Sequence, residues 1–116
     1  MMIRAPLTFA ALLLAAPALA QNAGEQAYAG DCSACHQATG QGVKGAFPAL
    51  AANPMVTGDP AAVIGVVLNG RAAMPSFKAD LSDAEVAEVV SYIRGAWGNK
   101  ATPVTASDVA AIRAKP

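Results

Sequence analysis

The sequence contains few of the residue types that build most catalytic and metal-binding sites. Its 116 residues include two cysteines, one histidine and one tryptophan, and only 14% of them are charged. Eight basic residues balance eight acidic residues, and the basic ones form no cluster. This distribution excludes the basic surface that nucleic-acid binding requires. The sequence also shows no pairing of a nucleophile with a general base, so no catalytic residue is assigned.

The sequence also lacks an apolar run long enough to cross a membrane. Its longest run covers about residues 5–20, whereas a spanning helix needs roughly 20 apolar residues. Arg4 precedes this run, and Ala18-Leu19-Ala20 at its end has the A-x-A pattern of a cleavage site. We therefore predict that residues 1–20 are a signal peptide that is removed on export to the periplasm, which leaves no stable membrane insertion. An uncleaved membrane anchor is the alternative.

Both cysteines and the single histidine lie together in Cys32-Ser33-Ala34-Cys35-His36. C-x-x-C-H is the attachment pattern of c-type haem, in which two thiols bind the porphyrin covalently and the histidine supplies an axial nitrogen to iron. Positions i, i+3 and i+4 share one face of a helix. Cys32, Cys35 and His36 are therefore expected to face one macrocycle.

Three other interpretations of the pentapeptide remain open. A thioredoxin-like redox pair accompanies a βαβ pattern, which the sequence does not show. A structural zinc site needs about four cysteine or histidine ligands, and the chain has three. A disulfide between Cys32 and Cys35 is common in an exported chain with two cysteines, although so short a loop adds little stability.

Helix start and stop signals predict an all-α fold. Asn22, with Glu25 three residues later, has the pattern of an N-terminal cap. The expected helices cover about residues 23–35, 60–69 and 83–97, and a short last helix begins at Thr105. The second is bounded by Asp-Pro and Asn-Gly, but its β-branched residues leave a buried strand open. The third follows an S-x-x-E capping box at Ser82.

Met74, followed by Pro75, is the best candidate for the second axial ligand of the iron. It lies in an expected loop between two helices, and Pro75 restricts the backbone there. Met55, in the turn 53–55, is the alternative, and either methionine could instead fill a gap in the core. Ligation by two histidines is excluded because the chain has only His36.

The order of these motifs resembles that of small class I c-type cytochromes, the bacterial single-haem kind. The matching segments are C-S-A-C-H, the stretch 40–50 ending in F-P-A-L, M-P-S-F at 74–77, and residues 81–93. The resemblance implies the cytochrome c fold, with three to five short helices around one covalently bound haem c. It assigns residues 21–98 to the cytochrome c domain and 99–116 to a C-terminal extension.

The resemblance also assigns roles to residues outside the motif. Pro48 matches the proline whose carbonyl accepts a hydrogen bond from the Nδ1–H of the ligand histidine. Arg71 is a candidate contact to a haem propionate, with a solvated surface arginine as the equal alternative. Trp97 is a further candidate for the propionate contact, although packing in the core is the better explanation of this residue. The first and last helices are expected to cross at Gly24, Tyr28, Val89 and Tyr92.

The resemblance implies a periplasmic one-electron carrier in which His36 and Met74 both bind the iron. Its partners would be a redox protein donor and acceptor that bind transiently. Two alternatives remain: an electron-transfer subunit of a periplasmic dehydrogenase, and a haem enzyme or gas sensor with an open sixth site. The chain has four lysines, too few for a basic ring, so electrostatic steering of the partner should be weak.

Overall fold

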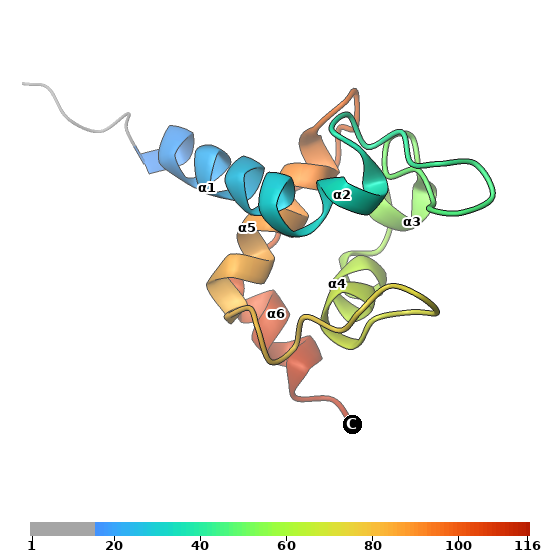
Figure 1. Cartoon of the computed structure of the whole chain (residues 1–116). Helices are drawn as coiled ribbons and strands as arrows, with labels where there is room; N and C mark the ends of the chain where they lie inside the picture. The colour runs from blue at the N-terminus through green and yellow to red at the C-terminus, as the bar shows by residue number, and fades with distance from the viewer. Residues whose placement is uncertain (1–15) are drawn as a thin grey trace, which may run out of the picture.

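The computed structural model describes residues 16–116, with side chains from Asn22 onward, so most of the predicted signal peptide lies outside the described residues. Within this range the chain forms six helices and no strand (Figure 1). They are α1 Ala16–Asp31, α2 Ser33–His36, α3 Pro54–Thr57, α4 Pro60–Asn69, α5 Asp83–Gly95 and α6 Ala106–Arg113. The all-α prediction is confirmed, and the buried strand considered for residues 60–69 is wrong.

The first predicted helix differs from the observed one at both ends. It begins at Ala16 and passes through Asn22, so the predicted cap at Asn22 is wrong. It breaks at Cys32, whose backbone leaves the α-helical region with φ −123° and ψ −36°, and one further turn, α2, follows. A second short helix, α3, replaces the turn expected around Met55, because the Asn53 side chain accepts a hydrogen bond from the Met55 N–H at 2.9 Å.

Side-chain caps begin the three longer helices that follow. Asp59 Oδ1 accepts the backbone N–H two residues later at 2.9 Å, with Pro60 at the first helical position. Reciprocal capping boxes open α5 and α6, formed by Ser82 with Glu85 and by Thr105 with Asp108. Each cap contributes roughly 1 kcal/mol to helix stability. The predicted starts of these helices are therefore confirmed, and α5 ends two residues earlier than expected.

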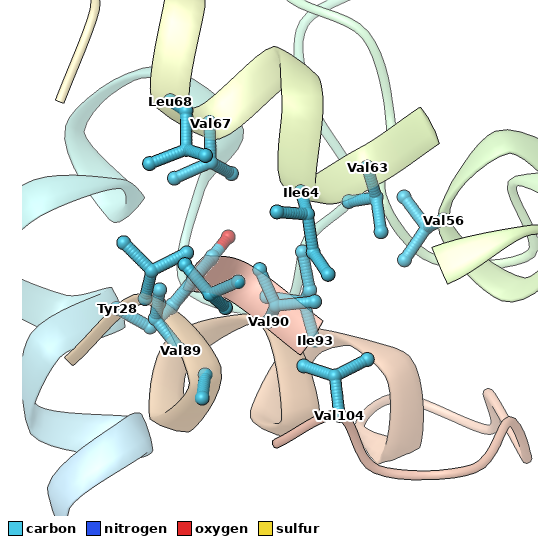
Figure 2. Close-up of a cluster of buried hydrophobic side chains, with 13 residues drawn as sticks. Tyr28, Val56, Val63, Ile64, Val67, Leu68, Val89, Val90, Ile93 and Val104 are labelled. Atoms are coloured by element: carbon cyan, nitrogen blue, oxygen red, sulfur yellow. The ribbon is translucent and has the colours of Figure 1, made fainter. Parts of the chain in front are cut away.

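Most side chains of the core come from α4 and α5. Figure 2 shows Val63, Ile64, Val67 and Leu68 of α4 facing the α5 side chains Val89, Val90 and Ile93. Ile64, Leu68 and Val90 are essentially inaccessible to solvent. Full burial of such a side chain contributes roughly 1.5–3 kcal/mol. The valine and isoleucine spacing of α5 thus directs one face of this helix inward.

The helices α1 and α5 cross at close range, as the resemblance implies. A Cβ at Gly24 would meet the Glu88 carbonyl oxygen and lie 2.9 Å from Tyr92 Cβ. One turn on, the Tyr28 ring packs against Tyr92 and Trp97, with ring centroids 5.6 and 4.9 Å apart. The expected crossing is confirmed, and Trp97 belongs to this aromatic cluster.

The C-terminal segment 99–116 packs against the rest of the protein. Val104 and Val109 are buried, and α6 lies against α4 and α5. Arg94 is also buried, and its guanidinium donates to the carbonyls of Val56 at 2.8 Å and Thr102 at 2.7 Å. This buried cation ties α5 to the segments on both sides of it. None of the helices in the described range is long and apolar enough to cross a membrane.

Candidate haem-binding site

The imidazole of His36 is held in one orientation and one tautomer. His36 ends the single turn of α2, its side chain is only 8% exposed, and its Nδ1 lies 2.8 Å from the Pro48 carbonyl oxygen. A carbonyl oxygen can only accept a hydrogen bond, so Nδ1 carries the proton. In the neutral ring Nε2 is then the nitrogen with a free lone pair, as a metal ligand requires.

A tight loop brings Pro48 to His36. Gly42 has φ +63°, and a Cβ there would meet the Phe47 carbonyl oxygen and lie 2.7 Å from both the Pro48 carbonyl carbon and the Ala49 nitrogen. Paired backbone hydrogen bonds of 2.8 Å between Val43 and Phe47 close the loop. Glycine is needed at position 42 because the backbone is left-handed and another backbone segment lies against it.

Asn99 anchors the same loop from the C-terminal side. Its side chain is buried, and its amide donates to the carbonyls of Leu50 at 3.1 Å and Ile93 at 2.8 Å. Its side-chain oxygen accepts the Ala52 N–H at 2.9 Å. These three hydrogen bonds of the Asn99 side chain join the segment after Pro48 to the end of α5. No residue pattern in the sequence points to this role of Asn99.

The two cysteines are free thiols: Cys32 lies at the break between α1 and α2, and Cys35 lies in α2. Cys32 is partly buried and Cys35 is exposed, so the disulfide alternative finds no support. Among the described residues, no three histidine, cysteine or acidic side chains gather to hold a metal ion, which argues against the zinc alternative. Burial, assisted by the nearby Asp31 carboxylate, raises the pKa of the Cys32 thiol to about 11. This thiol is therefore protonated at neutral pH.

Met74 lies in a short loop between α4 and α5 that is closed on both sides. On the N-terminal side, Arg71 and Met74 exchange backbone hydrogen bonds of 2.9 and 3.1 Å. A Cβ at Gly70, where φ is +73°, would lie 2.6 Å from the Met74 carbonyl oxygen. On the C-terminal side, the Ser76 hydroxyl donates to the Leu68 carbonyl at 2.5 Å. Met74 is partly buried and packs against the core.

The other residues considered from the sequence are placed differently. Met55 is partly buried on α3, beside the cap of that helix. The Arg71 side chain is exposed, and within the described residues it forms no hydrogen bond or ion pair. Trp97 follows the end of α5 and packs against Tyr28 and Tyr92. Met55 thus lies on a capped helix, whereas Met74 lies on a closed loop.

The donor set of the site fits haem c. Two free thiols lie three residues apart, an imidazole has its proton fixed on Nδ1, and a thioether lies on a fixed loop. Thiol, imidazole and thioether are the groups that attach and ligate haem in c-type cytochromes. Together with the all-α fold, they define the class of single-haem c-type cytochromes.

Comparison with known proteins identifies the family. Residues 19–93 match the family model described as cytochrome c oxidase, cbb3-type, subunit III. The chain is 39% identical to cytochrome c-552 of Thermus thermophilus, over 90% of this chain and 83% of that protein. Its fold is similar to the crystal structure of cytochrome c6 from the diatom Phaeodactylum tricornutum, with a TM-score of 0.56 and 33% identity, covering 66% and 92% of the two chains.

A further similarity is to a longer protein. The chain is 43% identical to the cytochrome c subunit of the quinone-dependent alcohol dehydrogenase of Gluconobacter oxydans, over 79% of this chain. It spans only 22% of the length of that subunit. The chain therefore belongs to the cytochrome c family and is a small class I cytochrome c. Its cofactor is haem c.

Proposed function

We propose that this chain is a periplasmic one-electron carrier whose haem is attached through Cys32 and Cys35 and ligated axially by His36 and Met74. The observation that carries the proposal is the 2.8 Å hydrogen bond between His36 Nδ1 and the Pro48 carbonyl. This bond fixes the ring so that Nε2 is the ligating nitrogen. Met74, on its separately closed loop, would supply a thioether ligand to the iron.

When bound, haem c supplies a one-electron Fe(II)/Fe(III) couple. The protein side chains set its properties. The Pro48 carbonyl oxygen accepts a hydrogen bond from the His36 Nδ1–H, which makes the imidazole a stronger electron donor. The softer thioether of Met74 favours Fe(II) and raises the reduction potential, and it closes the position at which a substrate or gas would bind. Apolar side chains such as Leu50 and Phe77, both partly buried against the core, exclude water.

Contact with the redox donor and acceptor is proposed to be transient and largely apolar. The chain has only four lysines, and its positive and negative charges balance. Val43 and Phe47, in the loop that leads to Pro48, are the large apolar side chains most exposed to solvent among the described residues. An interface of this composition gives little long-range steering and allows rapid release.

Export to the periplasm is part of the proposal. Cleavage after Ala20 would shorten α1 to its last eleven residues but keep Gly24 and Tyr28, which pack on α5. The part of α1 that contacts the core would therefore be retained in the domain 21–98. N-terminal sequencing of the protein from the periplasmic fraction tests this; an intact N-terminus on the folded, haem-bearing protein would contradict it.

A second candidate function is the electron-transfer subunit of a periplasmic dehydrogenase. The similarity to the alcohol dehydrogenase cytochrome subunit favours it. The two functions differ in whether a stable partner exists. Co-purification of the chain with a larger polypeptide, at constant ratio through two columns, would support the subunit; migration alone at its own mass would support the carrier.

Substitution of Met74 by alanine tests the ligation. We expect the reduction potential of the variant to be lower by on the order of 100 mV, a fraction of the roughly 0.8 V range over which axial ligands set haem potentials. The reduced variant should also bind carbon monoxide. Met55→Ala, which removes the alternative methionine ligand, is the matched control. It should leave the reduction potential and the carbon monoxide binding unchanged. An unchanged potential and spectrum in Met74→Ala would refute the assignment. Carbon monoxide binding by the wild-type protein would instead support the open-site enzyme or sensor.

A further inference from the structure

Arg113, in the last turn of α6, holds a segment that lies close to Met74 in the sequence. Its Nε donates to Asp83 Oδ1 at 2.6 Å. Its two terminal nitrogens donate to backbone carbonyls, Nη1 to Lys78 at 2.5 Å and Nη2 to Leu81 at 2.7 Å. One guanidinium thus joins α6, the first residue of α5 and the chain just before α5.

The two carbonyls belong to the second half of the loop that carries Met74, residues 70–82 (yellow in Figure 1). The middle of this loop is attached to the C-terminal end of α4, where Phe77 N and Lys78 N donate to the Val67 and Leu68 carbonyls, each at 3.1 Å. Arg113 attaches its C-terminal end to α6. The loop is therefore fixed at one point by α4 and at the next by Arg113.

The helix α6 is a firm support for this attachment. Val109 of α6 is completely buried, and the helix packs against both α4 and α5. The capping box of Thr105 and Asp108 holds its first turn. Opening the loop at Lys78 and Leu81 therefore requires either breaking the Arg113 hydrogen bonds or displacing a packed helix.

The hydrogen bonds to carbonyls matter more than the ion pair. Arg113 and Asp83 are about a quarter and a third exposed, and ion pairs at such exposure contribute little because water screens them. The hydrogen bonds from a charged donor to the Lys78 and Leu81 carbonyls are stronger than neutral ones. Only a planar guanidinium reaches all three acceptors at once; the point-like ammonium of lysine cannot.

We propose that Arg113 is a positioning residue that keeps the 70–82 loop closed, and so keeps Met74 on the iron. The inference rests on the proposed ligation by Met74. It gives the C-terminal segment 99–116 a role in controlling access to the sixth coordination position. Arg113 acts through the loop and does not itself contact the reacting atoms.

Imidazole binding to the oxidised holoprotein tests the proposal, because imidazole can occupy the sixth position only after Met74 leaves it. At saturating imidazole the binding rate reports how often the loop opens. We expect Arg113→Ala to raise this limiting rate roughly tenfold, which corresponds to about 1.4 kcal/mol. Arg113→Lys should fall between this variant and the wild type. Asp83→Asn, which keeps both carbonyl acceptors, should change the rate about twofold or less.

Two controls separate the possible failures. Val56→Ala leaves a cavity in the core, away from the loop, and should lower stability without raising the limiting rate. Equal rates in Arg113→Ala and the wild type, or an equal rise in Val56→Ala, would overturn the inference. If Arg113→Ala does not fold, an unchanged rate in Arg113→Lys overturns it. Met74→Ala should bind imidazole without a limiting rate; wild-type kinetics in that variant would refute the ligation itself.

Discussion

Two of the three left-handed glycines in the loop before Pro48 give a matched pair for testing how that loop is packed. Gly42 and Gly45 both have positive φ, +63° and +82°. A Cβ at Gly45 would have no atom within 4 Å, whereas a Cβ at Gly42 would meet the Phe47 carbonyl oxygen and the backbone of Pro48. Alanine at either position suffers the same kind of backbone strain, but only at Gly42 does it also collide with the loop.

The expected losses follow from these contacts. Placing alanine in the left-handed region costs roughly 1–2 kcal/mol in each variant. Overpacking against a backbone that cannot rotate away adds about 1–3 kcal/mol in Gly42→Ala alone. Thermal unfolding of the holoproteins measures the difference, since 1 kcal/mol shifts Tm by roughly 4–8 °C in a domain of this size. Gly42→Ala should therefore unfold several degrees below Gly45→Ala.

A second measurement connects the collision to the site. The new Cβ would push the Pro48 carbonyl away from His36 Nδ1, which it now meets at 2.8 Å. The Nδ1–H proton of Gly42→Ala should then exchange with solvent faster in NMR spectra, while that of Gly45→Ala stays protected. Equal Tm values and equal exchange in the two variants would refute the close packing of this loop around Pro48.

Three further predictions concern the other loop, the aromatic cluster and the partner. Gly70→Ala should destabilise the holoprotein by about 1–3 kcal/mol more than Gly98→Ala, because only at Gly70 would a Cβ approach the Met74 carbonyl; equal losses would contradict this. Burial raises the pKa of Tyr28 to about 12, so the free energy of unfolding should fall between about pH 10 and 12 as the unfolded chain loses this proton first. Tyr28→Phe should make that fall shallower. An unchanged pH dependence of the unfolding free energy, measured by denaturant titration at each pH, would count against this prediction. Electron transfer to a physiological partner should slow only slightly as salt increases, and a steep fall would show that charge guides the encounter.

The parts of the fold that the sequence predicted are those set by neighbouring residues. The capping residues Asp59, Ser82 and Thr105 act on N–H groups two or three residues away, so their patterns mark helix starts reliably. At Asn22 the same kind of pattern was misleading, because the preceding residues also adopt helix. The break at Cys32 was not predicted either, and the nearby Gly30 lies within α1 two residues before the break.

For the candidate site, the short-range chemistry was readable and the long-range support was not. The spacing of Cys32, Cys35 and His36 is itself the attachment pattern, so it needs no knowledge of the fold. The role of Pro48 was predicted only from the resemblance to c-type cytochromes, and in the structure its carbonyl oxygen lies 2.8 Å from His36 Nδ1. The assignment of Met74 as ligand stays a prediction, supported by the closed loop around it.

By itself, the sequence determined the chemistry of this protein: the thiols and imidazole of the haem c attachment pattern, the helical class, and the absence of a strong net charge. Only the tertiary structure decided how the two loops are held. Asn99 and Arg113 bind backbone carbonyls that lie 32 to 49 residues away. Every residue has a carbonyl group, so no residue type marks the acceptor, and the pairing exists only once helices distant in the sequence have packed together.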